Sequence, residues 1–396
     1  MPDAATAIPP PPARVSGSRW PRAAVTAVFL VHGMVFASWT AHIPQVKAHL
    51  GLSNASLGLA LLGAPAGSVS AMLLAAYLLP RLGSRRMVRI CLAGYCAAGP
   101  FAGLAGSLPA LFLALFVWGV FQGTLDVSMN TQAVTVERTE QRYLMPGLHG
   151  CWSIGTFAGA GLGTLGVGMG LSLSRQLLLL AVPALAVAGW LTTYMLPDLA
   201  PAQVRTHSRH RWLSPGLLTL GAVAFIGMLC EGAAADWSAV YLRGPLHGGA
   251  ALAGLGFTSF SLAMVLVRLS GNRLLTAMPP QRLLPVLATI ATVGLSAGLL
   301  LAQPIAALAG FACLGVGVAA VVPCVFTAAG RLPGLNAGTA VAAVSGFGWI
   351  GLVCGPPVIG QLATATSLPV ALGLVPILTA SLAAVTAFAP ALREGK

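Results

Sequence analysis

Residues 283–302 read LLPVLATIATVGLSAGLLLA and contain no charged side chain. A run of this kind is long enough to cross the hydrocarbon core of a bilayer as a helix, which takes about 20 residues. A transmembrane β-barrel would alternate apolar with polar residues along each strand. Because the apolar residues here are continuous, the stretch predicts a membrane-spanning α-helix.

Similar runs fill the rest of the chain. Its 396 residues are 57% hydrophobic and only 7% charged, whereas a soluble domain carries about 25% charged residues. Windows of about 20 apolar residues predict about 12 transmembrane helices. In chain order these predicted spans cover residues 23–42, 55–79, 87–106, 108–131, 145–169, 175–196, 214–240, 249–270, 283–302, 304–327, 338–363 and 368–390. The predicted fold class is therefore an all-α membrane protein with short loops.

The basic residues indicate how the chain is oriented. If the N-terminus is cytoplasmic, only Lys47, Arg175 and Arg243 of the 21 lysines and arginines fall on the opposite side of the membrane. All the others, Arg268 among them, are assigned to cytoplasmic loops and tails. Cytoplasmic loops of membrane proteins carry an excess of Lys and Arg. We therefore expect a multi-pass protein of the cell (inner) membrane with both termini in the cytoplasm.

The predicted spans divide into two sets of six. We expect a flexible cytoplasmic tail at 1–22, six-helix bundles at 23–197 and 214–391, a basic linker at 198–213 and a short tail at 392–396. Ala37-Ser-Trp-Thr-Ala41 resembles Ala235-Asp-Trp-Ser-Ala239, and Trp152–Gly163 can be laid over Trp349–Gly360 at nearly the same offset. This spacing favours two pseudo-symmetric halves, a repeat that places a substrate site between the halves near the bilayer midplane.

Three short stretches carry a family resemblance. They read GTLDVSMN at residues 123–130, followed by Val136-Glu-Arg138, HGCWSIG at 149–155 and EGAAADW at 231–237. With the topology and the repeat, they resemble the major facilitator superfamily and its sugar-permease branch around fucose permease and YbjJ-like transporters. The resemblance implies secondary active transport by alternating access, with symport of a small polar solute, such as a sugar or related metabolite, coupled to protons.

The loop between the second and third spans keeps only part of a superfamily motif, G-x-x-x-D-R-x-G-R-R. Arg81, Gly83 and Arg85 match it, whereas Pro80 replaces the acidic residue and Ala76 the first glycine. In the family this loop pairs charges across the cytoplasmic face and stabilises the outward-open state. Without its acid, the loop either acts as a weaker latch or holds arginines that only fix the topology.

Carboxylates inside the predicted spans are the first candidates for function. Ionisable groups at membrane depth cost a few kcal/mol and usually face a cavity or a partner. Asp126 and Asn130 are four residues apart and share a helix face. Burial disfavours the charged form of a carboxylate, so Asp126 can exchange a proton as access alternates. The resemblance places the fourth-span acid of proton-coupled sugar permeases here. We expect a proton-coupling or substrate-binding pair; the alternative is an interior hydrogen-bonding role.

Glu231 and Asp236 lie in the seventh predicted span. They are five residues apart, about 140° around an ideal helix, so both cannot point at one spot. We expect the deeper Glu231 to face the cavity. Asp236, beside Trp237 near the outer mouth, is predicted to act as a gate, hold a helix end or pair with Arg243. Trp237 and Trp39 also suit the aromatic belt at a membrane interface.

Two further residues are predicted in the substrate cavity, and a third is a candidate partner for the fourth-span acid. Gln122 and Trp349 offer an amide and an aromatic surface for a polar solute. His32 lies where some relatives carry an acidic residue, which makes it a candidate partner for Asp126. A structural role is the alternative for such a lone histidine.

The fifth span combines a polar start with a glycine stripe. His149 and Trp152, three residues apart at its cytoplasmic start, are predicted to form a gate or a helix-end contact. Gly155, Gly159 and Gly163 are spaced by four, a pattern that lets transmembrane helices approach closely.

Other classes of function have weak support. The sequence contains no P-loop, no H-E-x-x-H motif and no paired cysteine and histidine ligands, so we expect no enzyme activity, no cofactor and no metal. Basic residues are dispersed between apolar runs, which excludes nucleic acid as a partner. The expected partners are a small-molecule substrate, the proton and the lipid bilayer. We expect the protein itself to be a monomer. An exporter of drugs or metabolites, or a membrane sensor that does not transport, remains an alternative.

Overall fold

The computed structural model describes residues 19–140, 142, 144–198, 214–333 and 337–392. Most of the predicted tails and of the 198–213 linker lies outside these residues. Within them, all regular elements are helices. Eleven of the described helical segments are long and apolar enough to cross a membrane. The glycine-rich helix α7 (Met145–Gly168) is the further helix of matching length.

The first bundle matches the first six predicted spans, and three of these, the second, third and sixth, are built from consecutive shorter helices. Ser53 and Ser172 each accept a hydrogen bond from the backbone N–H three residues on, which caps the helix that follows. The elements are α1 (Trp20–Thr40), α2 (Ile43–His49), α3 (Asn54–Leu61), α4 (Gly63–Leu82), α5 (Ser84–Ala98), η1 (Gly99–Leu104), α6 (Leu108–Glu140), α7, α8 (Leu173–Ala184), η2 (Leu185–Gly189) and η3 (Thr192–Tyr194).

The second bundle repeats this arrangement. Its first helix begins with Ser214 as the capping residue and Pro215 in the first turn, where proline has no hydrogen bond to lose. The elements are α9 (Pro215–Arg243), α10 (Ala250–Leu269), α11 (Gly271–Ala277), α12 (Pro280–Leu301), α13 (Pro304–Val318), α14 (Val321–Ala329), α15 (Ala337–Ala365), α16 (Leu368–Leu372), α17 (Leu374–Phe388) and η4 (Pro390–Leu392).

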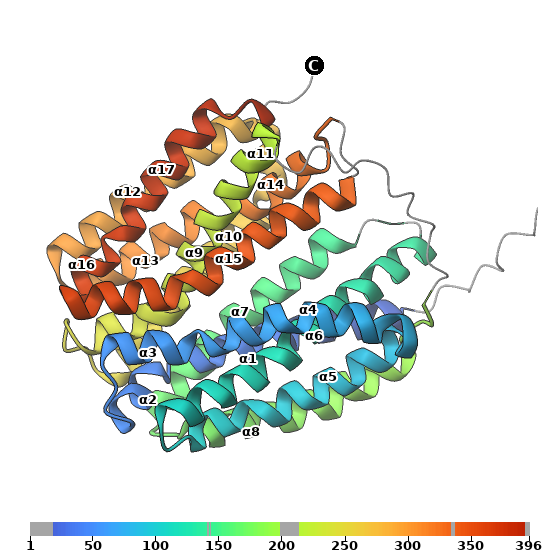
Figure 1. Cartoon of the computed structure of the whole chain (residues 1–396), viewed down its shortest axis with the longest axis horizontal. Helices are drawn as coiled ribbons and strands as arrows, with labels where there is room; N and C mark the ends of the chain where they lie inside the picture. Colours follow the sequence, from blue (N-terminus) through green and yellow to red (C-terminus); the bar gives the residue numbers. More distant parts are fainter. Residues whose placement is uncertain (1–18, 141, 143, 199–213, 334–336, 393–396) are drawn as a thin grey trace, which may run out of the picture.

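The two bundles meet at one end of the molecule and diverge toward the other. Figure 1 shows them in contact where α2, α3 and α16 lie and apart where α17 ends. We call these the α2 end and the tail end. At the α2 end, the backbone N–H of Ala55 donates to Thr364 Oγ1 at 2.9 Å, and a Cβ on Gly58 would lie 2.4 Å from the carbonyl oxygen of Pro356. The α2 end is therefore closed.

Glycines allow a close helix contact within the first bundle. A Cβ on Gly155, Gly159 or Gly163 of α7 would lie 2.2, 2.0 or 2.6 Å from a backbone carbonyl oxygen of α1. The predicted stripe of small residues is confirmed, and it packs on α1. In the second bundle, a Cβ on Gly351 of α15 would likewise lie 2.3 Å from the carbonyl oxygen of Phe225 on α9. The first and fifth spans of both bundles thus pair alike, as the repeat predicts.

Candidate functional site

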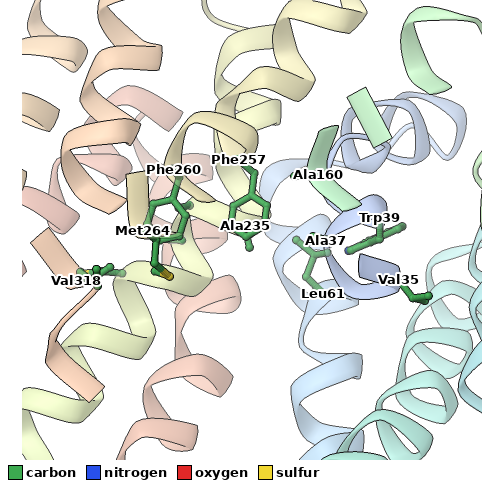
Figure 2. Close-up of a cluster of buried hydrophobic side chains, with 14 of the residues drawn as sticks. Val35, Ala37, Trp39, Leu61, Ala160, Ala235, Phe257, Phe260, Met264 and Val318 are labelled. Carbon is green, nitrogen blue, oxygen red and sulfur yellow. The ribbon is translucent and has the colours of Figure 1, made fainter. Parts of the chain in front are cut away.

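A cavity of about 60 Å³ lies between the two bundles. Figure 2 shows three of its lining residues, Trp39 and Leu61 from the first bundle and Ala235 from the second, within the buried hydrophobic cluster. The full lining consists of Phe36, Trp39, Leu61, Ala64, Pro65, Ser68, Leu115, Trp118, Gln122, Gly232, Ala235, Asp236, Trp349 and Leu352. Both halves therefore line one cavity, and Gln122 and Trp349 lie in it.

Asp236 is the one charged side chain among the described residues that line this cavity. Its carboxylate has no hydrogen bond or ion pair within the described part of the chain. The expected partner Arg243 donates instead to the carbonyl oxygen of Gly248 at 2.8 Å. Gln122 reaches the cavity from the opposite bundle, and no side-chain hydrogen bond holds its amide within the same described residues. Two polar groups thus face the cavity free to bind a ligand.

Aromatic rings form the wall of the cavity on the first bundle. Trp39 and Trp118 meet edge to face with ring centroids 6.3 Å apart. Tyr95 stacks on Trp118 at 5.5 Å, and His32 stacks on Tyr95 at 5.3 Å. Trp39 is only 4% exposed, and Trp237 on α9 is fully buried. The expectation that these two tryptophans lie at the lipid interface is wrong, because both pack inside the protein.

Asp126 and Asn130 lie on α6 beyond Gln122, toward the tail end. The amide of Asn130 donates to the backbone carbonyl of Asp126 at 2.8 Å and to its Oδ1 at 3.3 Å. The shared face predicted from their spacing is present. Asp126 has no ion pair among the described residues, so an uncompensated carboxylate lies at membrane depth here as well.

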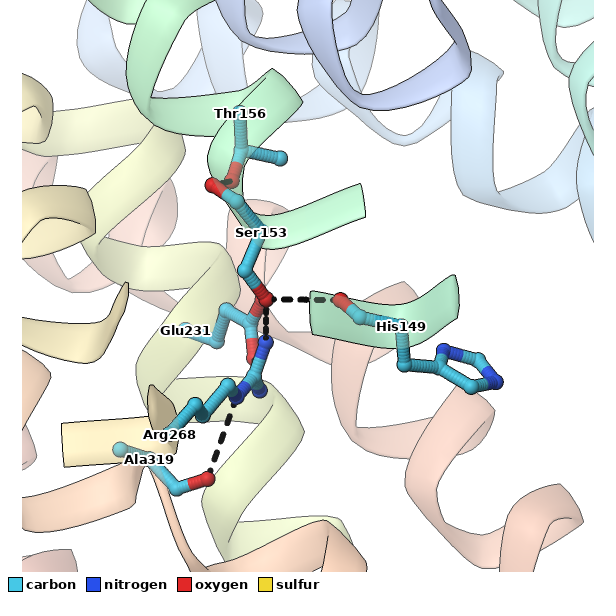
Figure 3. Close-up of polar contacts among 6 residues, drawn as sticks. All are labelled: His149, Ser153, Thr156, Glu231, Arg268 and Ala319. Carbon is cyan, nitrogen blue, oxygen red and sulfur yellow. Dashed lines mark hydrogen bonds and ion pairs between the residues drawn. The ribbon is translucent and has the colours of Figure 1, made fainter. Parts of the chain in front are cut away.

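Glu231 is placed differently from Asp236. Figure 3 shows it beside Arg268, with 3.9 Å between Oε2 and Nη2 and side chains 22% and 17% exposed. Arg268 also donates to Ser153 Oγ of α7 at 2.7 Å and to the carbonyl oxygen of Ala319 at 3.2 Å. The assignment of Arg268 to a cytoplasmic loop is wrong, because α10 continues through it and its guanidinium turns inward. Arg268 therefore links the second bundle to the first.

The other predicted polar residues lie in the first bundle. Trp152 Nε1 donates to His32 Nδ1 at 2.9 Å, so the ring of His32 is held by Trp152 and Tyr95, and no contact joins it to Asp126 among the described residues. His149 is exposed on α7 toward the tail end, with its ring edge-on to Phe29 at 5.4 Å.

The loop between α4 and α5, which lacks the acidic residue of the motif, contacts a carboxylate from the end of the sixth span, Asp198. Gly83 has a φ of +75°, and the next residue, Ser84, begins α5. The backbone N–H of Ser84 donates to Asp198 Oδ2 at 2.5 Å, and the Ser84 hydroxyl donates to the other carboxylate oxygen. Arg85 donates to the carbonyl oxygen of Thr193 at 2.7 Å, while Arg81 lies over the ring of Tyr77, 3.6 Å from its centroid.

These contacts bind the start of α5 to the end of the sixth span within one bundle. Asp198 was not a predicted site residue, and its position directly after Pro197 at the end of a span is the one sequence signal that could have suggested it.

A bundle of apolar helices in two halves, with a cavity between them, is the architecture of a membrane carrier. The profile of the Major Facilitator Superfamily matches residues 24–337, and the chain belongs to that family. It is 33% identical to an uncharacterized MFS-type transporter of Yersinia pestis, over 90% of this chain and 92% of that protein. It is 32% identical to the membrane protein MosC of Rhizobium meliloti, over 87% of this chain and 84% of that protein.

Two solved structures share the fold at low sequence identity. A D-xylose–proton symporter superposes with a TM-score of 0.75 and 12% identity, over 92% of this chain and 96% of that one. A mutant form of the nucleoside transporter NupG superposes with a TM-score of 0.70 and 14% identity, over 93% of this chain and 98% of that one. The expected fold class, with about twelve spans in two six-helix halves, is confirmed. The likeness to the fucose-permease and YbjJ-like branch stays a prediction.

Proposed function

We propose that this protein is a secondary active transporter that moves a small polar solute by alternating access, coupled to protons. The observation that carries the proposal is the cavity between the bundles, where Gln122 and Asp236 approach from opposite halves without partners. A site shared by two halves is exposed to one side and then to the other when the halves rock.

The contacts between the bundles support this cycle. At the α2 end they consist of close glycine packing and single hydrogen bonds, such as Thr164 Oγ1 with Thr258 Oγ1 at 3.1 Å. These contacts involve no charged side chain, so the two bundles can separate at the α2 end without leaving a buried charge unpaired. If the termini lie in the cytoplasm, as the charge bias predicts, closure of the α2 end corresponds to an inward-facing state.

Proton coupling is proposed for Asp126, with Asn130 as its neighbour. A carboxylate at membrane depth without a cation partner is stable in its neutral form, and a change of access to water lets it take up or release the proton. A D-xylose–proton symporter shares the fold, and proton coupling is proposed here by analogy with it.

The test is transport by purified protein in proteoliposomes. An imposed pH gradient should drive accumulation of a labelled solute from a panel of sugars, amino sugars, nucleosides and polyols. Reversing the gradient distinguishes uptake from export by the direction of movement. Asp126→Asn should lower accumulation against a gradient by about tenfold or more, whereas Glu140→Gln removes a carboxylate at the far end of α6 and should leave accumulation unchanged. Accumulation by Asp126→Asn equal to that of the unchanged protein would exclude this coupling.

A further inference from the structure

The charge of the central cavity points to the class of solute it binds. Among the described lining residues, Asp236 is the one acidic side chain and no residue is basic. A buried charge without a partner is costly unless something neutralises it. Either a proton or a positively charged ligand can supply that compensation.

The protein does not supply a cation itself. Arg268 is the basic group that the structure places inside the helix bundles near this site, and it already contacts Glu231, Ser153 and the carbonyl oxygen of Ala319. Glu231 comes five residues before Asp236 on α9, about 140° around the helix. Arg268 is therefore engaged with Glu231 and has no contact with Asp236 among the described residues.

The rest of the lining suits a cation as well. Phe36, Trp39, Trp118 and Trp349 surround the cavity with aromatic rings. A cation near the face of an aromatic ring is stabilised by about 0.5–2 kcal/mol, with tryptophan the best partner. Several amides would be expected for a neutral sugar, but Gln122 is the one amide in the described lining.

We propose that the cavity binds a small organic ammonium ion, with Asp236 as its counter-ion, the aromatic rings around its charge and Gln122 hydrogen-bonded to a hydroxyl or amine of the same solute. This assignment rests on the proposed function, since it names the solute class of the same site. It excludes anionic solutes, which would meet the Asp236 carboxylate.

The experiment compares matched solutes that differ only in charge. Binding to the purified full-length protein is followed by thermal shift with two sets: glucosamine, glucose and glucuronate, then ethanolamine, ethylene glycol and glycolate. The ammonium member of at least one set should stabilise the protein in a saturable way, and its neutral and acidic counterparts should not. Asp236→Asn should weaken that binding by about tenfold or more, since it leaves the bound cation unpaired.

Two further variants make the result specific. Asp236→Glu keeps the charge and should retain part of the preference for the ammonium member, and Glu140→Gln should bind like the unchanged protein. Gel filtration of Asp236→Asn establishes that it is folded. Stronger binding of a neutral or acidic member, no binding of either ammonium member, or unchanged binding by Asp236→Asn would each overturn the cation assignment. Gradient-driven transport of a neutral solute in the liposome assay would overturn it too, but would leave the proposed transport function standing.

Discussion

Two carboxylates on one helix, Glu231 and Asp236 of α9, have opposite surroundings. Glu231 lies 3.9 Å from Arg268, which is bound in turn to the other bundle through Ser153. Asp236 lines the central cavity and has no partner in the described part of the chain. A charge whose partner is part of the protein holds the structure together, whereas a charge without one is available to a ligand. We therefore assign Glu231 to the scaffold and propose Asp236 for the binding site.

The largest effect is expected from breaking the paired region. Arg268→Ala leaves Glu231 without its cation and removes the donor to Ser153, and leaving such groups without a partner inside the protein costs about 1–3 kcal/mol. The melting temperature of the purified protein should fall sharply. Adding Glu231→Gln to Arg268→Ala should restore part of the loss. A double variant no more stable than Arg268→Ala would contradict the pairing.

Substitution of Asp236, the carboxylate without a partner, is expected to have a small effect on stability and a large effect on transport. Asp236→Asn removes no contact within the protein, so its melting temperature should stay within a few degrees of the unchanged protein. Transport should fall by about a hundredfold, since the bound solute loses its counter-ion. Proteoliposome uptake and thermal unfolding, measured on one preparation, separate the two effects. Loss of stability with retained transport would reverse the roles of the two carboxylates.

The sequence predicted the spans and the different directions of Glu231 and Asp236, but not which of the two faces the cavity. The spans followed from hydropathy, because a bilayer requires about 20 apolar residues for each crossing. The spacing of Glu231 and Asp236 predicted that they face different directions, which is what the structure has. Which of them faces the cavity depends on the rotation of α9 about its axis, and a helix that is apolar on nearly all sides carries no signal for that rotation.

Arg268 and Asp198 illustrate a second limit. Arg268 lies one residue before the end of α10, where a basic residue is equally consistent with a loop and with a side chain turned inward. Its partner Glu231 belongs to another helix, and no local pattern connects them. Asp198 contacts Ser84 across 114 residues of sequence, so its role in place of the missing loop acid emerges only from the packing.

A moderate effect is expected at Asp126, the other carboxylate without a cation. Asp126→Asn keeps the size of the side chain but cannot exchange a proton. Accumulation driven by a pH gradient should fall by about tenfold or more, while exchange of labelled for unlabelled solute across the membrane should continue, because proton coupling contributes to the first process and not to the second. Equal loss of both activities would instead place Asp126 in solute binding.

The smallest effect is expected outside the cavity, at Asp198. Asp198→Ala leaves the N-terminus of α5 without its carboxylate, and such contacts contribute about 1 kcal/mol. Thermal unfolding should therefore shift slightly, with solute binding unchanged. A loss of stability as large as that of Arg268→Ala would show that the loop is as important for the fold as the Arg268–Glu231 ion pair.

Alternating access around the cavity is the central claim, and locking the α2 end tests it most directly. Ala55 and Thr364 are joined across the bundles by a 2.9 Å hydrogen bond, so cysteines at both positions should form a disulfide in a background that lacks the seven native cysteines. We expect the oxidised protein to bind solute but not to transport it, and reduction of the disulfide to restore uptake. Equal uptake by the oxidised and reduced protein would contradict the account.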